Sequence, residues 1–138
     1  MRLITALLLC AAVSVPAMAA QAYRAVNWLF VVPINADTFE VIEGRGEGAR
    51  GIWCAAADYA RAAGLDGVRK RMYVLEPRGP SRTQANAIGV TFTTNPSDEM
   101  AKTSSSFSVT VKRMGENLAI GHAYNFCASI FEERFDRF

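Results

Sequence analysis

The chain has 138 residues, of which 51% are hydrophobic, and its 15 lysines and arginines nearly balance 13 acidic residues. This length fits one domain, and the apolar fraction is too high for an intrinsically disordered chain. A formal charge of +2 excludes a strong general attraction to nucleic acid. We therefore expect one globular domain with no nucleic-acid partner.

The first twenty-odd residues have the layout of a secretory signal peptide. A positively charged start is followed by an uncharged apolar run that Pro16 ends. Two A-x-A patterns then predict cleavage after Ala19 or Ala22. We predict a signal peptide over residues 1–22 and a single domain over residues 23–138, located in the periplasm or secreted.

Two other fates of the N-terminus fit the sequence less well. An uncleaved anchor is conceivable because residues 3–23 carry no charge, but Pro16 and the A-x-A patterns favour cleavage. Lipidation at Cys10 is disfavoured because Leu9, not a small residue, precedes it. After Ala22 no apolar run reaches the roughly 18 residues of a membrane helix, so we expect no span after cleavage.

Hydrophobic periodicity predicts seven elements after the signal peptide, in the order β-β-α-β-β-β-α. The strands are predicted over residues 24–32, 38–43, 71–76, 87–94 and 106–112, and the helices over residues 52–63 and from about Ile120 onwards. Clean alternation in the later strands favours a mostly antiparallel five-stranded sheet with one solvated face. The two amphipathic helices would cover the other face, which makes the fold α+β.

Particular residues set the expected limits of these elements. In the first strand, Trp28 shares a face with other apolar side chains, and we expect both Trp28 and Trp53 in the core. Gly64 is expected to end the first helix as a C-cap residue, because glycine readily takes a left-handed conformation. Pro77 is expected to stop the third strand.

The loop over residues 44–51 contains four glycines that resemble a dinucleotide-binding fingerprint. Gly46, Gly48 and Gly51 fit G-x-G-x-x-G, and Glu76 ends the next predicted strand. A doubly wound sheet needs alternating strands and helices, whereas only one helix lies between strands here. We therefore interpret the segment as a loop leading into a helix, and we expect no cofactor.

The cysteines predict one disulfide. Cys10 leaves with the signal peptide, so the exported chain keeps Cys54 and Cys127, which an oxidising compartment would join. Such a bond would clamp the two helices to the sheet. The alternative is a nucleophilic Cys54 near the start of a helix, with His122, the only histidine, as its base. Two cysteines and one histidine make an incomplete zinc set, so no metal is expected.

Basic residues supply a candidate binding patch. Arg69, Lys70 and Arg71 form a cluster that could simply be a solvated strand edge, or could contact an anion such as a lipid headgroup or an acidic protein. Arg45 and Arg50 of the glycine-rich loop complete the patch. Its expected partner is an envelope protein or an anionic envelope component.

Residues 41–60, 72–76, 78–81, 90–93 and 122–127 together resemble a family of small exported bacterial proteins of unknown function. The resemblance spans most of the chain after the signal peptide. It implies export and a Trp-Cys helix paired with a C-terminal cysteine. It brings no activity, so it assigns no catalytic residue.

These patterns favour an exported, disulfide-stabilised domain that acts as a non-enzymatic binding or envelope-associated module. Few groups suited to catalysis occur together in the sequence, which is why an enzyme is disfavoured. The alternative function is a thiol-dependent hydrolase or redox protein that uses Cys54 and His122.

Overall fold

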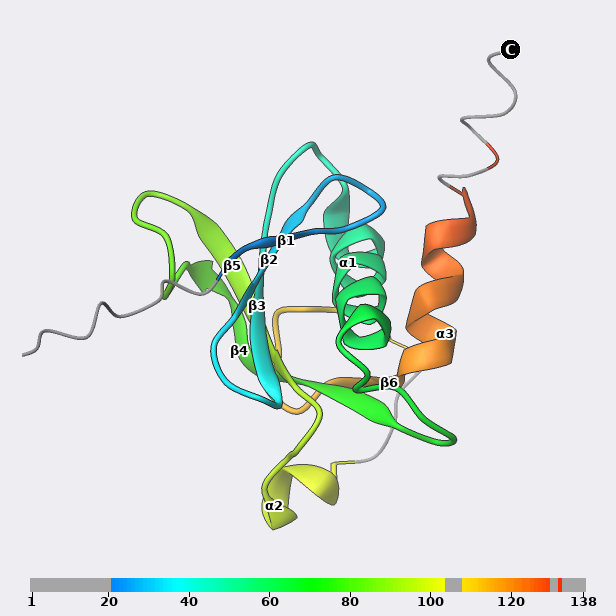
Figure 1. Ribbon diagram of the computed structural model, residues 1–138. Helices are drawn as coiled ribbons and strands as arrows, with labels where there is room; N and C mark the ends of the chain where they lie inside the picture. Colours follow the sequence, from blue (N-terminus) through cyan, green and yellow to red (C-terminus); the bar gives the residue numbers. More distant parts are fainter. Residues whose placement is uncertain (1–20, 104–107, 130–131, 133–138) are drawn as a thin grey trace, which may run out of the picture.

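The computed structural model in Figure 1 describes residues 21–103, 108–129 and 132. Residues 1–20 of the predicted signal peptide, with Cys10, and the start of the predicted strand over residues 106–112 therefore lie outside the described residues. Within the described ranges, no helix is long and apolar enough to cross a membrane.

The described chain forms one antiparallel sheet with helices packed beside it. Its strands are β1 (Tyr23–Arg24), β2 (Phe30–Pro33), β3 (Thr38–Ile42), β4 (Arg71–Pro80), β5 (Ile88–Thr93) and β6 (Asn117–Ala119). Its helices are α1 (Gly48–Ala62), α2 (Asp98–Ala101) and α3 (Ile120–Tyr124), which the 3-10 turn η1 (Asn125–Cys127) continues. The strand order is β1-β2-β3-β5-β4-β6. The α+β class and the antiparallel sheet are thus confirmed, but the described chain has six strands rather than five and a short extra helix, α2.

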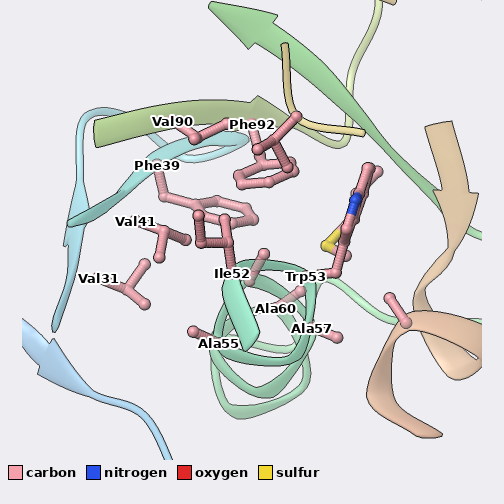
Figure 2. Close-up of a cluster of buried hydrophobic side chains, with 14 of the residues drawn as sticks. Val31, Phe39, Val41, Ile52, Trp53, Ala55, Ala57, Ala60, Val90 and Phe92 are labelled. Carbon is pink, nitrogen blue, oxygen red and sulfur yellow. The ribbon is translucent and has the colours of Figure 1, made fainter. Parts of the chain in front are cut away.

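Helix α1 packs on one face of the sheet and buries the centre of the core (Figure 2). Its Trp53 is fully buried and meets Phe92 of β5 edge-on, with ring centroids 4.9 Å apart. Phe39 of β3 stacks on the same Phe92 at 6.1 Å. Alanines on the buried side of α1 let its backbone lie close to the sheet; they are Ala55, Ala56, Ala57 and Ala60. Each fully buried large side chain contributes roughly 1.5–3 kcal/mol through the hydrophobic effect.

The ends of α1 follow from glycine chemistry. The helix begins at Gly48, four residues earlier than predicted from the apolar spacing. At its other end Gly64 has a φ of +72°, and the Leu65 N–H donates to the Ala60 carbonyl at 2.8 Å. This left-handed ending satisfies a carbonyl of the last turn, so the prediction that Gly64 terminates the helix is confirmed.

A disulfide joins Cys54 of α1 to Cys127 of η1, with the two Cα atoms 5.1 Å apart. Both cysteines are fully buried. Helix α3 lies alongside α1, and α1 contacts both α3 and η1 (Figure 1). The predicted covalent clamp between the first and the last helical segments is therefore confirmed.

The predicted strand over residues 24–32 is wrong in its middle. The structure divides it into β1 and β2, because the chain turns between Ala25 and Leu29. The two faces of this segment are not both covered: Leu29 is 2% exposed, whereas Trp28 is 42% and Phe30 44% exposed. Trp53 lies in the core as expected, but Trp28 does not.

Pro77 does not stop β4, contrary to the prediction. The register of β4 against β5 shifts between Val74 and Glu76 and again between Glu76 and Gly79. Such bulges leave residues outside the regular hydrogen-bond ladder, so a proline without an N–H is accommodated between them.

The segment over residues 108–112 is irregular rather than a strand. Its backbone carbonyls accept hydrogen bonds other than those of a regular strand pair. The Trp53 indole N–H donates to the Val109 carbonyl at 2.9 Å, and the Arg78 N–H donates to the Val111 carbonyl at 2.8 Å. The place of a further strand is taken by β6, which pairs with β4. The apolar residues of this segment thus contribute to the core, with Val111 3% exposed, but not to the sheet.

Reduction of the disulfide should lower the free energy of unfolding by up to about 4 kcal/mol, because the bond closes a loop with a sequence separation of 73 residues. Urea unfolding of the same purified chain, oxidised and reduced, measures this difference without altering any side chain. A matched double variant, Cys54→Ala with Cys127→Ala, should be insensitive to reductant. Equal stability of the oxidised and reduced wild type would contradict this role for the bond.

Candidate binding surface

The turn between β1 and β2 is held against α1 by a buried amide. Asn27 is fully buried, and its Nδ2 donates to the Gly51 carbonyl of α1 at 2.7 Å. Within the turn, the Trp28 N–H donates to the Ala25 carbonyl at 2.8 Å, and the Ala25 N–H donates to the Leu29 carbonyl at 2.9 Å. A buried amide without partners would be costly, so these bonds specify one position for the turn.

Asp58 of α1 provides a second attachment. Its Oδ2 accepts from the Val26 N–H at 2.9 Å and from the Tyr23 hydroxyl at 3.0 Å. Burial, together with this hydrogen bond and the nearby carboxylate charge, raises the pKa of Tyr23 to about 12. The turn and the strand that precedes it are therefore tied to the same helix.

The anchored turn presents an exposed cation stacked on aromatic rings, a set we call the Arg24 platform: Arg24, Trp28 and Phe30. The Arg24 guanidinium carbon lies 4.4 Å from the centroid of the Trp28 ring and 5.7 Å from that of Phe30. Trp28 has a φ of +70°, a left-handed conformation that is strained for a bulky side chain. Such strain, held in place by surrounding hydrogen bonds, is a frequent property of functional sites.

The loop between β3 and α1, which carries Arg45, lies at the same end of the molecule as the turn between β1 and β2 (Figure 1). Arg24 of β1 pairs with Phe30 of β2, which pairs with Ile42 of β3. Adjacent strands are about 5 Å apart, so Arg24 is roughly 10 Å from β3. Arg45 follows three residues after Ile42, is exposed, and has a φ of +57°. One end of the molecule therefore gathers strained, exposed and basic residues.

Arg50 extends the basic region over the first turns of α1. Its guanidinium lies 5.5 Å from the centroid of the Phe126 ring, whose other neighbour is the His122 ring at 5.5 Å, edge-on. A shallow hollow of about 200 Å³ opens here, lined by Glu47, Arg50, Gly51, Asn125, Phe126 and Ser129. The hollow contains both a cation and a carboxylate, so its own charge favours neither sign of ligand.

The second half of the predicted patch lies elsewhere. Arg69 and Lys70 are exposed in the connection that follows α1, and Arg71 begins β4. Helix α1 has 15 residues, which places them about 20 Å from Arg45 and Arg50. Arg71 is moreover engaged with Asn117 of β6, to which its Nε donates at 2.7 Å. The five basic residues thus form two separate groups.

The alternative function needs Cys54 as nucleophile and His122 as base, and these two residues differ in their exposure to solvent. Cys54 is bonded to Cys127 and fully buried, so in this form it has no thiol to ionise. His122 is exposed on α3. Among the described residues, no group of three or more histidine, cysteine, aspartate or glutamate side chains could hold a metal ion.

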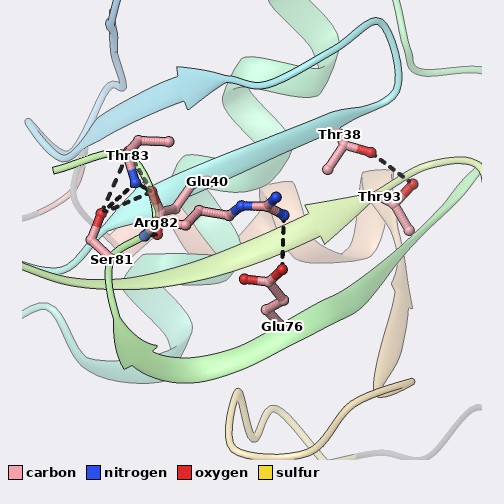
Figure 3. A network of polar contacts seen from close by, with 7 residues as sticks. All are labelled: Thr38, Glu40, Glu76, Ser81, Arg82, Thr83 and Thr93. Carbon is pink, nitrogen blue, oxygen red and sulfur yellow. Dashed lines mark hydrogen bonds and ion pairs between the residues drawn. The ribbon is translucent and has the colours of Figure 1, made fainter.

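On the sheet face opposite α1, the buried carboxylate of Glu40 organises the connection between β4 and β5 (Figure 3). Glu40 is 1% exposed. It accepts from the Arg82 N–H at 2.9 Å, the Ser81 hydroxyl at 2.9 Å, and both the N–H, at 3.1 Å, and the hydroxyl of Thr83. These donors replace the water that a buried carboxylate loses, so Glu40 pins the loop to the sheet.

Two neighbours complete this network. A Cβ at Gly89 would overlap the Glu40 carboxylate, so a larger residue there would displace Glu40 from its hydrogen bonds. The Arg82 side chain reaches over the sheet to Glu76, with an Nη1–Oε1 distance of 2.8 Å. The sequence carries one signal of this arrangement, a lone carboxylate between the apolar Phe39 and Val41, which the strand pattern alone does not distinguish from an exposed residue.

Comparisons with known proteins assign no relative. No family model, no curated protein and no solved structure matches the chain.

Replacing Glu40 by alanine should lower the free energy of unfolding by about 3 kcal/mol, because it leaves buried donors of the β4–β5 loop without an acceptor. The matched control is Glu76→Ala, which removes a carboxylate of β4 that pairs with Arg82 of the same loop. That ion pair is 49% and 45% exposed on its two sides, so its loss should cost less than about 1 kcal/mol. Urea unfolding compares the two variants, and an equal loss in both would contradict the role given to Glu40.

Proposed function

We propose that this protein is an exported, disulfide-stabilised binding module of the cell envelope, without catalytic activity, that recognises an anionic envelope component. The observation that carries the proposal is the environment of three exposed arginines. Arg24 and Arg50 stack on aromatic rings, and in the described part of the chain neither they nor Arg45 form an ion pair. Their charges are thus available to an anionic partner.

Contrast with other basic residues supports this interpretation. Arg78 lies 2.6 Å from Glu43, and this contact raises the pKa of Arg78, while Arg82 is paired with Glu76. The chain therefore neutralises arginines where they bridge strands and loops. Among the described residues Arg24, Arg45 and Arg50 form no such pair, although Glu47 and Asp58 lie at the same end and reduce its net positive charge.

The disulfide and the domain boundary are compatible with export. A buried disulfide is typical of proteins that fold in oxidising compartments. The first strand begins at Tyr23, so cleavage after either Ala19 or Ala22 would leave every described strand complete. These facts support export without deciding which site is cut.

Intact mass of the protein recovered from the envelope fraction tests export and thiol state together. We expect a chain that begins at Ala20 or Tyr23, with no thiol alkylated before reduction and two alkylated after it. A chain that retains its first residues, or that carries two free thiols when isolated, would refute the proposal. The second result would also restore Cys54 and His122 as a candidate thiol site.

Charge reversal tests binding. Arg45→Glu combined with Arg50→Glu should reduce retention of the exported protein on washed envelope membranes at least fivefold, because it replaces attraction to anions by repulsion. The matched control, Lys102→Glu with Lys112→Glu, reverses two exposed charges outside this end of the molecule. Equal retention of both variants and wild type would show that the basic end is not the binding surface.

A further inference from the structure

We propose that the Arg24 platform docks on the surface of a lipid bilayer that carries anionic phospholipids, with the Arg24 guanidinium contacting lipid phosphate and the aromatic rings entering the headgroup region. This inference rests on the proposed function and names its ligand. It assigns a role to Arg24, Trp28 and Phe30, which the sequence patterns did not single out as a site.

The geometry of Arg24 favours an anion as its partner. A guanidinium stacked over a ring leaves the N–H groups at its edge free to donate. Phosphate matches that edge with two parallel hydrogen bonds, and desolvation beside the rings strengthens them. Among the described residues no carboxylate forms an ion pair with Arg24. The stack thus positions the Arg24 guanidinium for an anionic ligand and leaves its charge unpaired.

The same stack argues against a neutral sugar as the ligand. Sugar binding to aromatic residues needs an open ring face, whereas the Arg24 guanidinium covers one face of Trp28 at 4.4 Å and approaches Phe30 at 5.7 Å. Tryptophan is instead suited to a membrane interface, because its ring is large and apolar and also carries one polar group.

The platform is accessible and rigid. It lies on β1 and β2, and β1 is the outermost strand of the sheet (Figure 1). The buried Asn27 and the carboxylate of Asp58 hold the turn to α1. The exposed aromatic groups therefore need little further ordering when they bind, which favours affinity.

The charges around the platform allow a modest, salt-sensitive attraction. Arg45 and Arg50 add to Arg24, while Glu47 and Asp58 oppose them. Glu43 is already paired with Arg78. The small positive excess adds to the direct Arg24 contact, and both should weaken as salt rises.

Tryptophan fluorescence provides a direct test with the unmodified exported chain. Its two tryptophans differ, because Trp53 is fully buried and Trp28 is 42% exposed. Vesicles of phosphatidylcholine with one quarter phosphatidylglycerol should shift the emission to shorter wavelength, and brominated lipid should quench it. Pure phosphatidylcholine vesicles should do neither. Trp28→Gly, which keeps a residue suited to the left-handed conformation, should abolish the response.

Vesicle co-sedimentation tests the residues. Arg24→Gln with Phe30→Ser should reduce partitioning onto the anionic vesicles about tenfold, through the lost charge and the lost apolar contact. The matched control is Lys102→Gln with Met114→Ser, which also removes one exposed cation and one exposed apolar side chain. It should bind as wild type does. Thermal melting checks that each variant is folded. If a variant is unfolded, the fluorescence response of the wild type to the vesicles tests the inference in its place.

Several results would overturn the inference: no response to either vesicle, an equal response to neutral vesicles, an equal loss in the control variant, or sedimentation without vesicles. Full competition by inorganic phosphate, with no lipid quenching, would show a soluble anion site instead. If the protein does not bind the vesicles but is exported and has two cysteines that are alkylated only after reduction, only the lipid ligand is refuted. Failure of export itself refutes the proposed function.

Discussion

The close packing of α1 on the sheet is the constraint on which the remaining structure depends. One side of the helix buries Trp53 against Phe92. Another side is joined covalently, through Cys54 and Cys127, to the segment that follows α3. A third contact, from Asn27 to the Gly51 carbonyl, ties the first turn of the domain to the start of the same helix. Loss of the α1 position would therefore release the sheet, the C-terminal helix and the exposed turn together.

Hydrogen bonds of buried polar side chains fix the positions of two loops. Asn27 fixes the turn that presents Trp28, and Glu40 fixes the connection between β4 and β5. Asn27 bonds to backbone groups, whereas Glu40 accepts from backbone N–H groups and from two hydroxyls, and each would be costly to leave unpaired. The apolar core thus determines the layers of the fold, whereas these few hydrogen bonds give the surface its definite shape.

The proposed binding role follows from how arginines are used. Where Arg78 and Arg82 bridge neighbouring elements, carboxylates neutralise them. At the opposite extreme, Arg24 stacks on Trp28 and Phe30 and keeps its hydrogen-bonding edge for a partner. A strained Trp28 held outward by buried anchors is difficult to explain as packing alone, because folding would favour a smaller residue there.

Local sequence patterns were enough to predict the α+β class, the start of the last helix, the glycine that ends α1 and the pairing of Cys54 with Cys127. These depend on local periodicity, on a residue's own conformational freedom, or on a count of cysteines. Tertiary structure decided the turn at Trp28, the passage of β4 through Pro77, the irregular segment before β6, and the Arg24 platform. Each depends on a partner distant in the chain, such as the Gly51 carbonyl for Asn27 or the indole of Trp53 for Val109, and no alternation of apolar and polar residues encodes such a partner.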